Sequence, residues 1–198
     1  MMPEAFLLAA GESRRMGVPK PLVPFGDSTV LATMAHAFRA AGCSPITVVH
    51  RPGDIRLLEA VHALGLRAVA NADPSPGMSS SVAVAAESAS SEWLALCPCD
   101  MPLLTAGTLA RVVQALADCG GDVLQPAVDG RRKHPVVIKR TWLLARTESL
   151  RGGTPLRELL GDAEDTSVEF PDEAEFLDFD TREEYEALVR LARGRRVE

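Results

Sequence analysis

Three cations follow the first apolar run of the chain within one short segment. Residues 7–10 are apolar, the chain turns at Gly11, and the cations are Arg14, Arg15 and Lys20. Glycine lets backbone N–H groups approach an anion closely, guanidinium groups match phosphate oxygens, and lysine adds a mobile positive charge. The spacing matches neither a Walker loop nor a dinucleotide-binding fingerprint. The segment predicts a triphosphate cradle, with a solvated basic turn as the alternative.

Asp100 follows another apolar run, "WLALCP", in a stretch stiffened by Pro98 and Pro102. A carboxylate there suits Mg²⁺, which prefers oxygen ligands. The alternative is an Asp that bonds backbone N–H groups ahead of a helix, although Thr105 already fits the helix cap.

A third loop joins Gly77 to the serines at 79–81, which lead into a helical pattern. Ser80 and Ser81 could present hydroxyls to a base or ribose, or one serine could simply cap the helix. His134 precedes an apolar run, where a lone histidine is commonly structural. Asp180 stands beside a helix start and could be only a favourable charge there.

Composition narrows the function classes. The chain has 198 residues and a formal net charge of -6, from 21 Lys plus Arg against 27 Asp plus Glu. That balance argues against nucleic acid as a partner but allows a local anion site. No apolar stretch is long enough to cross a bilayer. The four cysteines form no CxxC pair, which favours a reduced, cytoplasmic protein and buried thiols over a metal site at Cys97 and Cys99.

Short apolar runs alternate with helical periodicity. We expect strands at 5–10, 45–50, 66–71 and 93–97, the last of them central, and then at 122–128, 134–140, 166–170 and 175–179. Helices are expected at 28–42, 54–64, 79–88 and 105–118, at 154–160 with Thr154 as cap and Pro155 in the first turn, and from Thr181, which forms a capping box with Glu184. Tyr185, Leu188 and Val189 of that last helix should face inward. One α/β domain over 1–198 follows, with a mainly parallel sheet covered by helices on both faces.

The motifs together resemble a known family. "LAAGESRRMGVPK" is similar to the LAAGxSxRMGxxK signature of the MobA-like nucleotidyltransferases, a branch of the Rossmann-like three-layer nucleotide-diphospho-sugar transferase fold. "GMSSSV", "CPCDMPLLT", "RRKHPVVI" and "FLDFDTREEY" resemble further family elements in the same order. The likeness covers nearly the whole chain and is nearest to the molybdenum cofactor cytidylyltransferases. Arg132 and Lys133 depart from it, standing where the family commonly has Pro-Gly, and only Gly152 and Arg157 match a later acceptor-side segment.

The resemblance implies transfer of a nucleoside monophosphate from an NTP to the phosphate of a pterin, molybdopterin, with release of pyrophosphate. It implies Arg15, Lys20 and Asp100 as the catalytic residues. Mg²⁺ would be held by Asp100 together with Asp178 or Asp180, and His134 and Arg157 would lie on the acceptor side. The implied nucleotide-binding residues are Leu8, Ala9, Ala10, Gly11, Ser13, Arg14, Arg15, Lys20, Gly77, Ser80 and Ser81.

The resemblance also bears on the base and on partners. Ala9-Ala10-Gly11 matches the AAG of cytidylyltransferases, where guanylyltransferases typically read LAGG, so CTP is expected. The methyl group of Ala10 would crowd a purine. The alternatives are a guanylyltransferase using GTP, a relative acting on another small phosphate acceptor, and a non-catalytic protein that carries the cofactor to an apo-enzyme. The product would pass through a transient contact to a molybdoenzyme or its chaperone.

Overall fold

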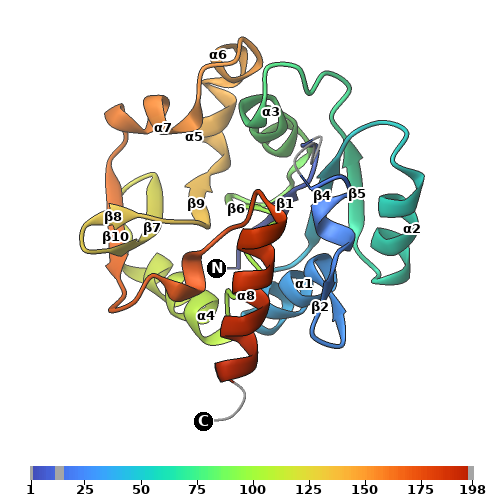
Figure 1. Ribbon diagram of the computed structural model, residues 1–198. Helices are drawn as coiled ribbons and strands as arrows, with labels where there is room; N and C mark the ends of the chain where they lie inside the picture. The colour runs from blue at the N-terminus through green and yellow to red at the C-terminus, as the bar shows by residue number, and fades with distance from the viewer. Residues whose placement is uncertain (1, 12–15, 196–198) are drawn as a thin grey trace.

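The computed structural model describes residues 2–11 and 16–195. Its central sheet has the strand order β10-β7-β9-β6-β1-β4-β5, and β8 pairs with β7 beside this path (Figure 1). The strands are β1 (Glu4–Leu8), β4 (Ile46–His50), β5 (Arg67–Ala70), β6 (Trp93–Pro98), β7 (Val123–Val128), β8 (Arg131–Arg132), β9 (Val136–Lys139) and β10 (Asp165–Glu169). A separate hairpin joins β2 (Pro24–Phe25) to β3 (Ser28–Thr29).

The sheet is mainly parallel, as the sequence predicts. β1 runs parallel to β4 and β6, β4 to β5, and β7 to β10. β9 is antiparallel to both β6 and β7, with Leu96 opposite Val136. This reversal brings the start of β9 to the sheet edge where β1, β4 and β6 end. In an open parallel sheet, ligands bind at that edge.

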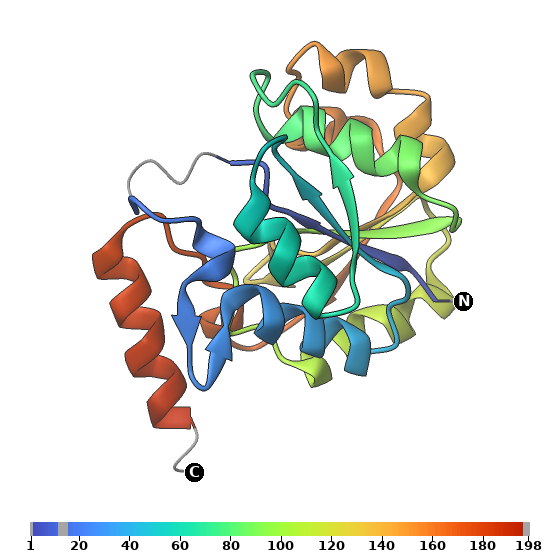
Figure 2. The same cartoon turned by 90° about the vertical axis from the view of Figure 1, so that its right-hand side faces the viewer.

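Helices cover both faces of the sheet (Figures 1 and 2). The helices of one face are α1 (Val30–Ala40), α2 (Ile55–Ala63), α4 (Ala106–Gln114) and α8 (Arg182–Arg195), and those of the other are α3 (Met78–Ser88), α5 (Arg140–Leu144), α6 (Thr147–Arg151) and α7 (Leu156–Leu159). Four short 3-10 turns complete the set: η1 (Lys20–Leu22), η2 (Ala115–Asp118), η3 (Leu160–Asp162) and η4 (Ala174–Phe176).

Two hydrophobic cores form because side chains alternate across each strand. In β1, Leu7 packs into the core with α1 and α4, whereas Phe6 packs into the core with α3. Val48 and Val49 of β4 divide in the same way. All six residues of β6 are buried, in agreement with the predicted central position of that strand.

Local sequence signals set several helix ends. Thr105 caps α4 by accepting a hydrogen bond from the Thr108 N–H at 3.1 Å. The capping box at the start of α8 is confirmed, because Glu184 accepts from the Thr181 N–H and Thr181 from the Glu184 N–H. In α8, Leu188 is buried while Tyr185 and Val189 pack against the core at partial burial.

Two expected features are wrong. The stretch 175–179 is not a strand: it holds the 3-10 turn η4, because buried Phe176 packs edge-on against Phe170 and Asp172 accepts from the Ala174 N–H. Thr154 is not a helix cap either. Pro155 occupies the cap position of α7, and no side chain caps this helix.

Among the described residues, no helix combines the length and apolar character needed to span a membrane.

Candidate active site

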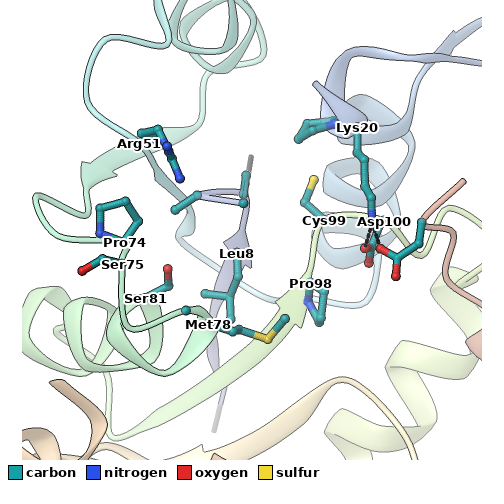
Figure 3. Close-up of a pocket in the computed structure, with 16 residues that line it drawn as sticks. Leu8, Lys20, Arg51, Pro74, Ser75, Met78, Ser81, Pro98, Cys99 and Asp100 are labelled. Carbon is teal, nitrogen blue, oxygen red and sulfur yellow. Dashed lines mark hydrogen bonds and ion pairs between the residues drawn. The ribbon is translucent and has the colours of Figure 1, made fainter. Parts of the chain in front are cut away.

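A cavity of about 750 Å³ opens where β1, β4 and β6 end (Figure 3). The first loop, the segment after β4, the loop before α3, the segment after β6 and the segment before α8 all contribute to it. Its lining residues are Leu8, Ala9, Ala10, Gly11, Lys20, Pro21, Arg51, Pro74, Ser75, Gly77, Met78, Ser81, Pro98, Cys99, Asp100 and Asp180. Nine of the site residues predicted from the sequence therefore line this one cavity. The predicted Ser13, Arg14 and Arg15 lie outside the described residues.

Lys20 joins two carboxylates that are far apart in sequence. Its Nζ donates to Asp100 Oδ2 and to Asp180 Oδ1, each at 2.7 Å (Figure 3). It also lies 5.4 Å from the centre of the Phe179 ring. Lys20 begins η1, Asp100 follows β6, and Asp180 precedes α8. The sheet and the packing of α8 thus place one cation between two anions.

Burial and charge act in opposite directions at this cluster. Burial raises the pKa of the Asp100 carboxyl; the Lys20 ammonium opposes that rise, while the charges of Asp178 and Asp180 add to it. Burial alone would lower the pKa of Lys20, but hydrogen bonds and charges from Asp100 and Asp180 outweigh it and raise the pKa. Lys20 is therefore cationic at neutral pH.

Asp100 fits a divalent cation. Its Oδ1 is buried and has no hydrogen-bond partner among the described residues. Such an orphaned oxygen is costly unless a ligand satisfies it. No group of three or more His, Cys, Asp or Glu side chains in the described part of the chain could enclose a metal. Mg²⁺ sites in nucleotide enzymes commonly need only one or two carboxylates, with phosphates and waters completing the shell.

The two predicted alternatives for a second carboxylate are now distinguishable. Asp180 lines the cavity and shares the Lys20 ammonium with Asp100. Asp178 is exposed and does not line that cavity. Its charge still raises the pKa of Asp100, by no less than the charge of Asp180 does, and it partly offsets the burial that lowers the pKa of His134. The shared Lys20 ammonium nevertheless makes Asp180 the better candidate beside Asp100.

Asn71 organises the serine loop. It is buried just after β5, and its Nδ2 donates to Ser80 Oγ at 2.8 Å and to Ser81 Oγ at 3.1 Å. Ser80 in turn donates to the carbonyl of Gly77 at 2.8 Å. The Ser80 hydroxyl, predicted to lie near the base or ribose, is instead held inside this network, whereas Ser81 lines the cavity. Gly77 itself occupies the N-cap position of α3 with φ +89°, so the predicted serine cap does not form.

A second cavity of about 450 Å³ adjoins the first, because Leu8 and Met78 line both. The structure brings the predicted acceptor-side residues His134 and Arg157 into its wall. Arg132 and Lys133 also line it. Burial lowers the pKa of His134, against a smaller opposing effect of Asp178, so the ring is neutral at neutral pH.

The residues that depart from the family pattern make local ion pairs. Arg132 pairs with Asp165, and Lys133 Nζ lies 3.0 Å from Glu173 Oε2. These pairs attach the β8–β9 segment to β10 and to the chain before η4. The second cavity therefore has a cationic rim held by neighbouring acidic residues.

The sequence analysis missed two cavity-lining residues, Arg51 and Gln125, and Asn71, which holds the serine loop from behind. Arg51 directly follows β4, a position that a search for charges at strand ends would have found. Asn71 and Gln125 carry no such signal. Their roles depend on the docking of α3 and on the register of β7, which one sequence does not reveal.

The surroundings of Cys97 and Cys99 agree with the prediction of buried thiols rather than metal ligands. Cys97 and Cys99 are fully or almost fully buried, and burial raises the pKa of each thiol, most strongly for Cys97. Metal ligation requires the thiolate form, which this environment disfavours.

Comparison with known proteins supports this picture. Residues 5–167 match the model of the MobA-like NTP transferase domain. A Mycobacterium avium (strain 104) protein named "Probable molybdenum cofactor guanylyltransferase" is 32% identical over 175 residues, covering 86% of each chain. The solved structure of the Rv0371c homolog from Mycobacterium sp. strain JC1 has a TM-score of 0.78 at 25% identity, covering 98% of each chain. The structure of Mycobacterium tuberculosis H37Rv Rv0371c complexed with manganese has a TM-score of 0.68 at 22% identity, covering 96% of this chain and 99% of that one.

Proposed function

The chain belongs to the MobA-like NTP transferase domain family, and from this premise we propose that it transfers a nucleoside monophosphate from an NTP to the phosphate of molybdopterin. The observation that carries the proposal is the junction of two cavities at one sheet edge. One is built from cations, a carboxylate pair and a glycine-containing loop, and the other from apolar residues with a cationic rim.

The donor nucleotide fits the first cavity. Lys20 offers an ammonium held in place by two carboxylates, and Gly11 leaves open space in which a triphosphate oxygen can approach the backbone. Arg51 adds a guanidinium to the same cavity. These groups would neutralise the charge that grows on the α-phosphoryl and on the leaving pyrophosphate.

The reaction needs no covalent protein intermediate. An anionic oxygen of the acceptor phosphate forms a bond to the α-phosphorus, while the bond from that phosphorus to the bridging oxygen breaks. The electron pair leaves with pyrophosphate, whose added charge Lys20 can balance. The protein contributes alignment and electrostatic stabilisation, which are large effects for phosphoryl transfer.

Asp100 and Asp180 would hold a divalent cation, for which we propose Mg²⁺. When bound, the cation would supply positive charge to phosphate oxygens. The buried Oδ1 of Asp100, which has no hydrogen-bond partner among the described residues, is the observation that favours this assignment. The manganese in the related Rv0371c structure is consistent with a divalent ion in this fold.

The donor base has two candidates. The relatives named guanylyltransferases favour GTP, which was the alternative interpretation of the sequence, so the predicted preference for CTP is not confirmed. CTP remains a second candidate on one observation: Ala10 lines the cavity, and its methyl group takes space that a glycine would leave for a purine.

A pyrophosphate-release assay tests both choices. The purified protein would receive GTP, CTP, ATP or UTP with Mg²⁺, each with and without molybdopterin in its molybdenum-loaded and metal-free forms. We expect release only when molybdopterin is present, with GTP faster than CTP. Faster release with CTP would establish the cytidylyl alternative. Nucleotide binding without release under every condition would support the non-catalytic carrier.

A further inference from the structure

Two buried side-chain oxygens lack a hydrogen-bond partner among the described residues: Asp100 Oδ1 and Gln125 Oε1. Each belongs to a residue that lines a cavity, Asp100 the first and Gln125 the second. An unsatisfied buried acceptor is uncommon and calls for an explanation. For Asp100 Oδ1 the proposed partner is a divalent cation. Gln125 Oε1 instead requires a hydrogen-bond donor, which a ligand in the second cavity would supply.

The position of Gln125 is set by β7. Val123, two residues earlier, packs into the core beside α3 and α5, while Leu124 packs into the opposite core. Because side chains alternate along a strand, Gln125 points to the same face as Val123. That face carries the second cavity, which residues of β7, β9 and α7 line.

The orientation of the Gln125 amide is also determined. Its Nε2 donates to the carbonyl oxygen of Lys133 at 3.2 Å. Turning the amide over would place two oxygens against each other, since a carbonyl only accepts. Oε1 is therefore held as a hydrogen-bond acceptor, and Gln125 is only 5% exposed.

The surroundings describe the ligand that would satisfy Oε1. Leu96, Val136 and Leu160 give the cavity apolar walls. Arg157 is exposed at the rim and forms no ion pair with any residue that the structure describes. Apolar walls, one buried acceptor and a rim cation suit a flat heterocycle that has an N–H edge and carries an anionic group.

We propose that Gln125 determines acceptor specificity by accepting a hydrogen bond from a ring or amino N–H of a planar heterocyclic phosphate. This inference rests on the proposed function, because a pterin presents such an N–H edge. Gln125 would select the acceptor and leave the donor nucleotide unaffected, since it lies outside the first cavity.

The experiment uses two probes on the intact protein. One is a pterin monophosphate, and the other is the same compound methylated at N3 and dimethylated at the 2-amino group, so that this edge has no N–H. Dissociation constants are measured by calorimetry for the wild type, for Gln125→Met and for Gln114→Met. Gln114 is exposed at the end of α4, so it is the matched control.

We expect the wild type and Gln114→Met to prefer the unmethylated probe by about tenfold, as the loss of one buried hydrogen bond predicts. Gln125→Met should lose this preference and bind GTP and CTP normally. If Gln125→Met keeps the preference, the assignment of Gln125 is overturned while the pterin acceptor stands. If the wild type binds neither probe, the pterin acceptor and this inference both fail.

Discussion

The ammonium of Lys20 and the carboxylate of Asp100 lie 2.7 Å apart, although 80 residues separate them along the chain. The parallel pairing of β1 with β6 creates this contact, because it carries the loops after both strands to the same sheet edge. The pair explains why an acidic chain places cations after its first strand. Among the described residues, Lys20 faces a part-buried carboxylate and, in the proposed reaction, a triphosphate.

Replacing Lys20 by Met should lower kcat about 10²- to 10³-fold, because one fixed cation is lost from the transition state. The variant should still fold, which circular dichroism would check. Lys139→Met is the matched control: Lys139 pairs with Asp122 at 3.0 Å and lines neither cavity. Undiminished turnover in Lys20→Met would remove Lys20 from the mechanism.

Asp100→Asn and Asp180→Asn should each weaken Mn²⁺ binding in the presence of nucleotide by at least about tenfold, since each removes an oxygen anion from the site. Asp178→Asn should have a smaller effect, because Asp178 lies outside the cavity. Paramagnetic resonance of free Mn²⁺ measures this binding without requiring turnover. Exposed Asp118 supplies the control substitution. A larger loss in Asp178→Asn than in Asp180→Asn would reverse the assignment.

Asn71→Ala should raise the dissociation constant for nucleotide about tenfold, because Ser80 and Ser81 lose the amide that orients the loop. The double variant with Ser80→Ala should bind no more weakly than Asn71→Ala alone, since both act through one network. Thr47→Val removes a buried hydrogen bond to Glu4 far from the cavities, so it separates lost stability from lost binding. Additive effects in the double variant would show that Asn71 acts independently of Ser80.

Stability should fall as the pH drops below about 6.5, partly because of His134. Burial lowers the pKa of His134 in the folded protein below its ordinary value of 6.5, so the unfolded chain takes up the proton first. The loss should approach about 1.4 kcal/mol per pH unit at most and level off below the folded-state pKa. Urea unfolding between pH 5 and 7.5 should give a flatter profile for His134→Gln than for the wild type. His62→Gln, on the exposed side of α2, is the control; equal slopes in all three proteins would contradict the prediction.

Much of the fold could be predicted because its signals are local. Short apolar runs predicted the strands, and Thr105, Gly65 and the Thr181–Glu184 pair marked helix ends that the structure contains. The stretch 175–179 misled because its apolar side chains suggested a short strand, while the packing of Phe176 against Phe170 goes with a 3-10 turn. Helices α5 and α6 are five residues each, too short for periodicity to reveal.

Candidate site residues could be predicted where they lie in the loops that follow strands. Lys20, Gly77 and Asp100 could be assigned to one edge because parallel strands end together. The choice of Asp180 over Asp178, the Asn71 network and the orientation of Gln125 depend on contacts between segments far apart in the chain. Those contacts follow from packing, which spacing alone does not encode.

The central claim is nucleotidyl transfer, and the fate of a labelled α-phosphate tests it most directly. The protein would be incubated with Mg²⁺, molybdopterin and GTP or CTP radiolabelled at the α-phosphate, and the products separated by chromatography. We predict that the label moves onto molybdopterin in a one-to-one ratio with released pyrophosphate, and that Lys20→Met slows the transfer about 10²- to 10³-fold. Label that stays in the nucleotide, or leaves as free monophosphate without joining molybdopterin, would contradict the proposed function.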